Sequence, residues 1–190
     1  MERGFALQQV HLEALGQSHL EYVADPTICF PRSRLTSRTD LCVAEDASAI
    51  LSDAFMWHDP RGTQQIAFDT LVMETAIRRP NGSLLALDRS RLTTARAPLD
   101  NPALLGPYRA FSTLFAVGRG AASEAALTAV RAALVPLPGI YAGVSRLPAE
   151  IGLWLRILAM DGAALRTAMD RAWRTCHEVM LGWACDRRRK

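Results

Sequence analysis

Strict alternation of apolar and polar side chains constrains this sequence most. Within residues 71–78, one face of an extended segment carries Leu71, Met73, Thr75 and Ile77, and the other carries Glu74 and Arg78. A two-residue period is that of a β-strand. The turn sequence Pro80-Asn81-Gly82 follows and leads into a second apolar run at 83–87. The pattern therefore predicts a β-hairpin over residues 71–87.

Short extended runs of this kind fill the first two-thirds of the chain. From Phe5 to about Arg119 there is no helix-period segment of useful length, and turn residues separate the runs, for example Asp25-Pro26, Pro31 and 59–62. The predicted strands cover residues 19–24, 34–45, 48–57 and 111–117, with later ones at 140–146 and 153–158. We therefore expect a mainly β structure.

Two helices are predicted after Gly120. Ser123 is a suitable N-cap for an alanine-rich helix at about 123–135, which Pro136 would end. A second helix is expected at about 163–184, because its apolar residues recur at three- and four-residue steps: Leu165, Met169, Ala172, Cys176 and Trp183. Its other face is charged, as in a helix that packs on a sheet. The expected fold class is α+β.

Size and composition fit one domain over residues 1–190. A chain with 49% hydrophobic and 22% charged residues can bury a core, and no linker or repeat divides it. The net charge is only +3, and the basic tail at 187–190 has no interleaved aromatic residues, which argues against a nucleic-acid partner. No signal peptide and no apolar run of about 20 residues is present, so we expect a cytoplasmic protein without a membrane partner.

The metal-binding residue types show no strong local motif. The four cysteines never form a C-x-x-C pair, which favours four reduced thiols, and no two histidines have helical spacing. Cys176 is expected in the core and His177 at the surface. His58-Asp59, beside Asp53 at the end of an apolar strand, is a compact cluster with nickel-ligand chemistry, although a solvated turn is the favoured interpretation.

Signals for catalysis are weaker still. Residues 118–123, GRGAAS, follow a predicted strand and open a helix, as a dinucleotide-binding loop does, but the third glycine is Ser123 and no acidic residue lies about 20 positions further on. A strand-to-helix turn is the favoured interpretation. Gly143-Val144-Ser145-Arg146 lacks the second glycine of a nucleophile elbow. The residues alone therefore identify no enzyme.

One longer passage resembles a known family. Residues 19–31, HLEYVADPTICFP, are similar to the passage L-E-[WY]-L-P-x-x-x-I-x-F-P of the UreD (also called UreH) family of urease accessory proteins. Further segments follow in the family's order between Phe5 and Gly182: Arg34-Leu35, LSDAF at 51–55, LDRSRL at 87–92, YAGVS at 141–145 and LRIL at 155–158. The resemblance covers most of the chain.

The resemblance implies a β-helix-like winding of short strands with C-terminal helices, and a function without catalysis. Such a protein is a scaffold or chaperone that binds UreF, which recruits the GTPase UreG, and the complex docks on apo-urease for nickel insertion. No tightly bound cofactor is implied, only transient nickel(II). Position by position, the family's acidic residues match Asp53, Asp88 and Glu21. Carboxylates can hold a hydrated cation loosely enough to release it. The alternative is that Glu21 and Asp88 lie on solvated strand faces, with Asp88 paired to an arginine.

The sequence also departs from the family pattern in two places. The family's preceding portion with a G-G-D motif is absent, so we expect a shortened chain with an exposed β edge. Residues 56–65 replace the family's L-G-R-x-x-x-G-E stretch, and His58 and Asp59 could supply substitute ligands there. Two other functions remain open: a docking module that does not activate urease, and a small hydrolase.

Overall fold

The computed structural model describes residues 4–58, 68–95 and 98–185. Its strands are β1 Ala6–Ala14, β2 His19–Val23, β3 Thr27–Cys29, β4 Arg34–Val43, β5 Ser48–Trp57, β6 Thr70–Arg78, β7 Leu84–Thr93, β8 Ala110–Val117, β9 Ile140–Arg146 and β10 Gly152–Ala159. Its helices are α1 Glu124–Leu134, the short 3-10 helix η1 Pro148–Glu150 and α2 Gly162–Leu181. The mainly β, α+β fold class predicted from the sequence is confirmed.

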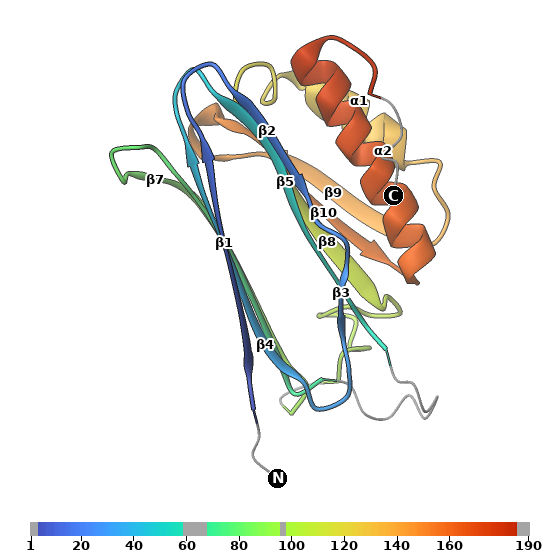
Figure 1. Ribbon diagram of the computed structural model, residues 1–190. Helices are drawn as coiled ribbons and strands as arrows, with labels where there is room; N and C mark the ends of the chain where they lie inside the picture. The colour runs from blue at the N-terminus through green and yellow to red at the C-terminus, as the bar shows by residue number, and fades with distance from the viewer. Residues whose placement is uncertain (1–3, 59–67, 96–97, 186–190) are drawn as a thin grey trace.

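The strands form two sheets that face each other, and both helices cover the outer side of the larger sheet (Figure 1). The four-stranded sheet has the order β1-β4-β6-β7. The six-stranded sheet has the order β2-β5-β8-β10-β9, and β3 also pairs with β5. From β1 to β6 the chain passes back and forth between the sheets, with β2 and β3 both in the larger one. As a result β1, β4 and β6 pair in parallel in one sheet, while β2 and β5 pair in parallel in the other. This is the β-helix-like winding that the family resemblance implied.

The hairpin predicted at 71–87 is formed by β6 and β7. The turn between them closes with a hydrogen bond from Arg79 N to Ser83 O (3.0 Å) and has Gly82 at φ 84°. This left-handed conformation favours glycine. Glu74 and Arg89 lie opposite each other on the outer face and form a salt bridge.

Both predicted helices are present, and the ends of each are capped. Ser123 Oγ accepts a hydrogen bond from Ala126 N (3.1 Å) at the start of α1. Asp161 caps α2 by accepting from Ala163 N (2.9 Å) and Ala164 N (2.8 Å). Gly182 ends α2 in the left-handed conformation, with φ 79°. None of the helices in the described ranges is long and apolar enough to span a bilayer.

The segment between β8 and α1 is a tight turn. Gly118 has φ 120°, and a Cβ there would lie 2.6 Å from Ser48 Cβ, so a side chain does not fit. The strand before the turn, β8, is antiparallel to both of its neighbours, β5 and β10. A dinucleotide-binding loop requires a parallel βαβ unit. The structure therefore agrees with the strand-to-helix turn favoured for residues 118–123.

The core has an outer layer and an inner layer. The outer layer lies between the six-stranded sheet and the helices, where Leu155 and Ile157 of β10 pack with Leu165 and Ala168 of α2. The inner layer lies between the sheets and contains two apolar clusters. One cluster is built around Leu41, Leu51, Ile77 and Phe115. The other is built around Phe55, Phe68, Leu71 and Phe111.

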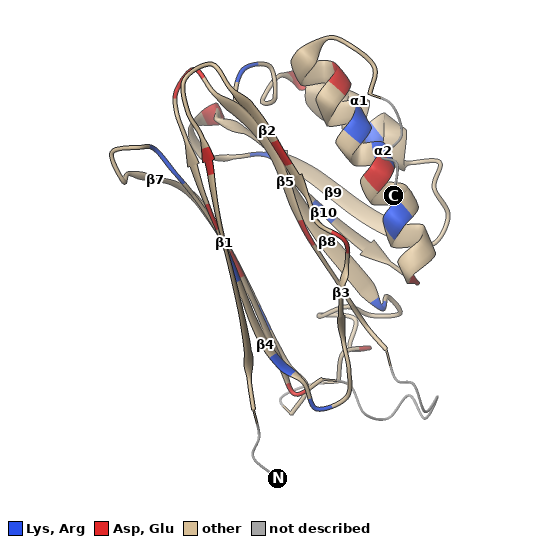
Figure 2. Cartoon of the chain, viewed as in Figure 1, with Lys and Arg blue, Asp and Glu red and all other residues tan. Residues whose placement is uncertain are grey.

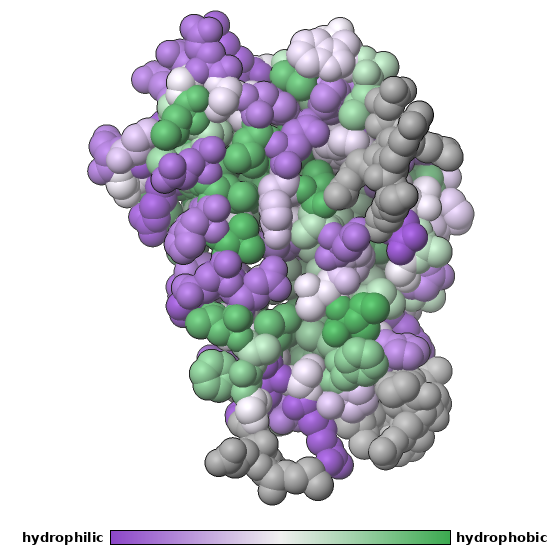
Figure 3. Space-filling model, in the orientation of Figure 1, coloured by the Kyte–Doolittle hydropathy of each residue, from purple (hydrophilic) through white to green (hydrophobic). Residues whose placement is uncertain are grey.

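The edge strands β1 and β2 follow one another in the chain. Each is the terminal strand of its sheet within the described ranges. Figure 3 shows apolar surface on the same side of the molecule, in the region of β1 and β3. Exposed apolar side chains of this region are Phe5, Leu7, Ile28 and Phe30. The exposed β edge expected from the sequence is therefore present among the described strands.

Candidate functional site

A belt of polar side chains crosses the space between the two sheets. The alternation of each strand turns every second residue inward, and at the middle of six strands that residue is polar. We call this set the polar layer: Ser37 and Thr39 of β4, Thr75 of β6, Asp88 of β7, Asp53 of β5, Thr113 of β8 and Arg156 of β10. The strand registers place it between the two inner apolar clusters, since Asp53 stands between Leu51 and Phe55.

Asp53 is the most enclosed acid of the polar layer, with 8% of its surface exposed. Its Oδ2 accepts hydrogen bonds from Thr75 Oγ1 (3.0 Å) and Thr39 Oγ1 (3.4 Å). Burial raises the pKa of this carboxyl, and the negative charge of Asp88 adds to the effect. The two hydroxyl hydrogen bonds oppose the shift without cancelling it. Asp53 therefore holds a proton more readily than an ordinary aspartate does.

A cavity of about 250 Å³ adjoins Asp53. It lies between the sheets, and its polar lining includes Gln8, Tyr22, Thr27 and Ser37. A space of this size in a polar setting can hold several water molecules. Asp53 thus faces a cavity that has room for a hydrated ion.

Asp88 has a different environment from Asp53. Its Oδ2 accepts from Arg156 Nη2 at 2.9 Å, and the same guanidinium donates to Ser90 Oγ at 3.2 Å. The guanidinium carbon of Arg156 also lies 5.5 Å from the ring centre of Phe111 and 5.3 Å from that of Trp154. Arg156 is therefore well fixed, and it competes with any cation for Asp88. The alternative for Asp88 therefore holds in part: it pairs with an arginine, but with Arg156 of β10, and it faces the space between the sheets and not solvent.

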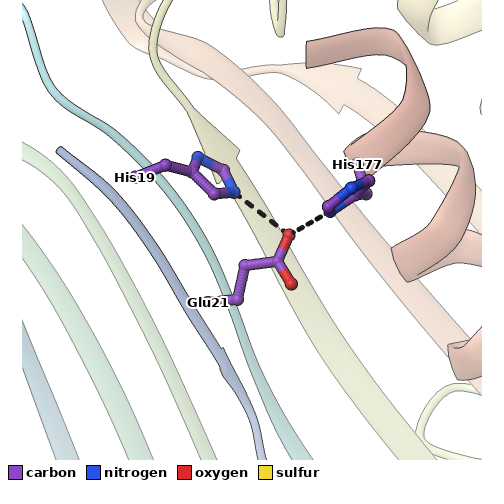
Figure 4. A group of neighbouring side chains, drawn as sticks. All are labelled: His19, Glu21 and His177. Atoms are coloured by element: carbon purple, nitrogen blue, oxygen red, sulfur yellow. Dashed lines mark hydrogen bonds and ion pairs between the residues drawn. The ribbon is translucent and has the colours of Figure 1, made fainter. Parts of the chain in front are cut away.

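A second polar cluster lies on the opposite face of the six-stranded sheet, beneath α2 (Figure 4). We call His19, Glu21 and His177 the imidazole–carboxylate cluster. Glu21 Oε1 is 3.0 Å from Nε2 of His19 and 2.7 Å from Nδ1 of His177. Figure 2 shows acidic residues on strands of both sheets, and the acidic residue of β2 is Glu21. Among the described residues, this is the group of three whose ligand-type atoms all lie within 4.8 Å of one another.

The second oxygen of Glu21 is also engaged. Its Oε2 accepts from the indole Nε1 of Trp173 at 2.9 Å. Burial pushes the pKa of Glu21 upward, but the hydrogen bonds from His177, His19 and Trp173 and the charge of His177 outweigh burial. The net result is a pKa below the ordinary value, so Glu21 is ionised at neutral pH. Deep burial, together with the negative charge of Glu21, raises the pKa of the neighbouring Cys176 to about 12, which disfavours its thiolate form.

The structure separates the five residues predicted as a nickel relay. Asp53 and Asp88 both belong to the polar layer, whereas Glu21 lies on the other face of the sheet. His58 is exposed at the end of β5, with its ring 6.1 Å from that of Phe30. Asp59 lies outside the described residues. As a residue of the edge strand Glu21 is exposed, in line with the solvated-face alternative, but its side chain is 22% exposed and bonds to three other side chains.

The prediction that His177 lies at the surface is wrong. His177 is 8% exposed, because α2 turns it toward β2 and not toward solvent. Cys176 is in the core as predicted, at 2%. A usable signal was the spacing of four between Trp173 and His177, which places both on one helix face. His19 and Glu21, two residues apart on a strand, share a face in the same way.

The winding, the covering helices and the two polar clusters define a mainly β protein with one polar cluster on each face of its larger sheet. A family model described as UreD urease accessory protein matches residues 1–190. The chain is 34% identical to urease accessory protein UreD 1 of Pseudomonas syringae pv. syringae, over 97% of this chain and 65% of that protein. Identity is 35% to UreD 1 of Methylorubrum extorquens, over 96% of this chain and 61% of that protein.

The chain belongs to the UreD urease accessory protein family. A third relative, UreD 1 of Pseudomonas syringae pv. tomato, is 36% identical over 97% of the chain. The chain spans 65% of the length of this relative too, so it corresponds to somewhat less than two-thirds of the proteins it matches.

Proposed function

We propose that this protein is a cytoplasmic scaffold of urease maturation. In this proposal it docks with UreF and the GTPase UreG on apo-urease and assists the insertion of nickel into the urease active site. Family membership supports the accessory role, because the matched relatives are named urease accessory proteins. Nickel is cargo in this process and not a resident cofactor.

The polar layer is the observation that carries the nickel-handling part of the proposal. It supplies carboxylate and hydroxyl oxygens inside an otherwise apolar sandwich, beside the cavity at Asp53. A small number of oxygen ligands binds a hydrated divalent cation weakly enough for the cation to be released. Asp53 is better suited to this role than Asp88, because Arg156 already neutralises Asp88.

The open strand edges support the docking part. β1 and β2 each pair on one side only within the described ranges, and the exposed side chains of Phe5, Leu7 and Ile28 lie near them. An unpaired edge with apolar neighbours is a surface that another protein can cover by adding a strand or by packing against it.

The test is to express this chain with UreF, UreG and apo-urease and measure complex formation and nickel-dependent urease activity. Asp53→Asn removes the carboxylate of Asp53 while preserving the shape of the side chain. We expect the variant to form the complex but to activate urease at least tenfold less efficiently. Asp46→Asn, in the exposed turn between β4 and β5, is the matched control and should activate normally. Full activation by Asp53→Asn would refute the role of the polar layer.

A docking module without nickel transfer is the second candidate, because the open edges of β1 and β2 would serve docking whether or not Asp53 handles nickel. It predicts complex formation with no gain of urease activity for the wild-type chain. Absence of any complex would contradict both candidates.

A further inference from the structure

The imidazole–carboxylate cluster presents a ligand set that the polar layer lacks. Two imidazole nitrogens and one carboxylate oxygen converge from β2 and α2. Imidazole nitrogen suits zinc, copper, nickel and iron, whereas magnesium and calcium prefer oxygen alone. The ligand types therefore favour a divalent ion of the late first transition row.

The spacing of the three ligand atoms fits one ion. Two ligands at right angles around an ion, each about 2.1 Å from it, lie about 3.0 Å apart, and two opposite ligands lie about 4.2 Å apart. Glu21 Oε1 is 3.0 Å from His19 Nε2 and 2.7 Å from His177 Nδ1, and no pair among the three exceeds 4.8 Å. Shifts of a few tenths of an ångström would bring all three into contact with one ion.

Surrounding side chains hold the ligands in place, as they do in established metal sites. His19 Nδ1 is 2.7 Å from Ser48 Oγ. The hydroxyl of Ser48 can donate to this nitrogen, or accept from it when Nε2 binds a metal, so it supports either tautomer. Trp173 fixes the other carboxylate oxygen of Glu21 at 2.9 Å. Two of the three ligands thus have an orienting partner.

The site is enclosed but reachable. The side chains of His19, Glu21 and His177 are 20%, 22% and 11% exposed. The ring of Trp183, itself exposed, lies 5.9 Å from the ring of His177. Partial exposure leaves coordination positions for water or an exchanging ligand, and an ion with only three protein ligands can leave again.

The ring of His177 is buried, and only one of its two nitrogens has a bonding partner among the described residues. Its Nε2 is buried and has no hydrogen-bond partner within the described part of the chain. Its Nδ1 is already committed to the carboxylate. If Glu21 served only to attach α2 to β2, a hydrogen bond to one histidine would be enough. A second histidine contacts the same carboxylate oxygen, and it adds a metal-binding side chain that this attachment does not require.

We propose that His19, Glu21 and His177 form a binding site for one divalent transition-metal ion of the zinc and nickel class. The site lies beneath α2, on the face of the six-stranded sheet away from the polar layer. It rests on local geometry and not on the proposed role in urease maturation. Because protons and the ion compete for the same ring nitrogens, binding should weaken as the pH falls.

The test is calorimetric titration of the untagged 190-residue chain with ZnCl2 and, separately, with NiCl2, in the absence of urease or other proteins. We expect one ion per chain at this site. His19→Ala and Glu21→Gln should each weaken binding at least tenfold. His11→Ala is the matched control, because His11 also lies near a carboxylate, 3.9 Å from Asp40, but has no third ligand. It should bind as the wild type does.

Circular dichroism distinguishes a lost site from a lost fold. His19→Ala changes a partly exposed residue of an edge strand, so we expect a native spectrum together with the weakened binding. Unchanged affinity in folded His19→Ala and Glu21→Gln, or no binding of either ion by the wild type, would overturn the proposal. Because no urease is present, this result is independent of the outcome of the maturation assay.

Discussion

Nδ1 of His177 lies 2.7 Å from Oε1 of Glu21, and this contact joins residues 156 positions apart in the chain. Through it the last helix is attached to the edge strand β2. Trp173 adds a second bond from α2 to the same carboxylate. One side chain of β2 therefore receives two donors from α2, four residues apart on one helix face.

Replacement of Glu21 should change how stability depends on pH. A carboxyl whose pKa is lowered by folding stabilises the fold above its ordinary pKa, here 4.5, and this contribution disappears as the pH falls through the lowered value. Glu21→Gln should lower the free energy of unfolding by about 2 kcal/mol at pH 7, because bonds to a charged group are lost. Urea denaturation at pH 7, 5 and 3 should show the difference from wild type shrinking toward pH 3.

Glu13→Gln is the control for that series, because Glu13 is exposed on β1. It should follow the wild type at each pH. A gap between Glu21→Gln and wild type that stays constant down to pH 3 would contradict the assigned role of the ionised carboxylate.

Asp53 should show the opposite dependence. Burial raises its pKa above the ordinary 3.8, so its contribution to stability is fully present below that value and is lost as the pH rises through the raised one. Asp53→Asn, whose amide oxygen can still accept from Thr39 and Thr75, should be more stable than wild type at pH 8. The advantage should vanish as the pH approaches 3.8. Thermal unfolding across this range measures it, and a variant less stable at pH 8 would refute the argument.

Gly152 marks a close approach between two strands. A Cβ at this position would lie 2.0 Å from the carbonyl oxygen of Ala116 on β8. Gly152→Ala must displace backbone and should cost about 1–3 kcal/mol. Gly143→Ala on the adjacent strand β9 is the matched control, since nothing lies within 4 Å of its added methyl group. Equal denaturant midpoints for Gly152→Ala and Gly143→Ala would contradict this prediction, because they would show that the sheet accommodates the added methyl group at Gly152.

The packing of α2 on the sheet can be tested at Leu165. This side chain is fully buried in the outer core layer, so Leu165→Ala should cost about 2–5 kcal/mol through lost burial and a residual cavity. Arg166→Ala, at the next and exposed position of the helix, should change stability by less than about 0.5 kcal/mol. Similar losses of stability from Leu165→Ala and Arg166→Ala would mean that packing of α2 on the sheet is not the main contribution of Leu165 to stability.

Local patterns in the sequence were enough to predict most elements of the fold. Alternation predicts β6 and β7, and the residues 80–82 predict the turn between them, because both signals are confined to neighbouring residues. Ser123 likewise predicts the start of α1. The parallel pairing of β1, β4 and β6 is different. This pairing joins strands that are separated in the chain by strands of the other sheet. No local sequence pattern predicts which of these strands become neighbours.

The candidate sites were predictable only in part. Asp53 and Asp88 were predicted as functional residues, and both face the space between the sheets. Sequence reasoning assigned His177 to the surface because it follows the buried Cys176, yet the face of α2 that carries Trp173 and His177 turns toward Glu21. The deciding contact is a tertiary one, so the imidazole–carboxylate cluster emerges only when β2 and α2 are placed together.

The long separation between Glu21 and His177 has a consequence for biosynthesis. At about 5–20 residues per second, a ribosome needs roughly 8–30 s to add the 156 residues that follow Glu21 up to His177. Throughout that interval the helix that supplies both donors to Glu21 has not been made. The face of β2 that α2 covers in the folded protein therefore stays open for far longer than a hairpin takes to form, which gives a binding partner or general chaperone a reason to act during translation.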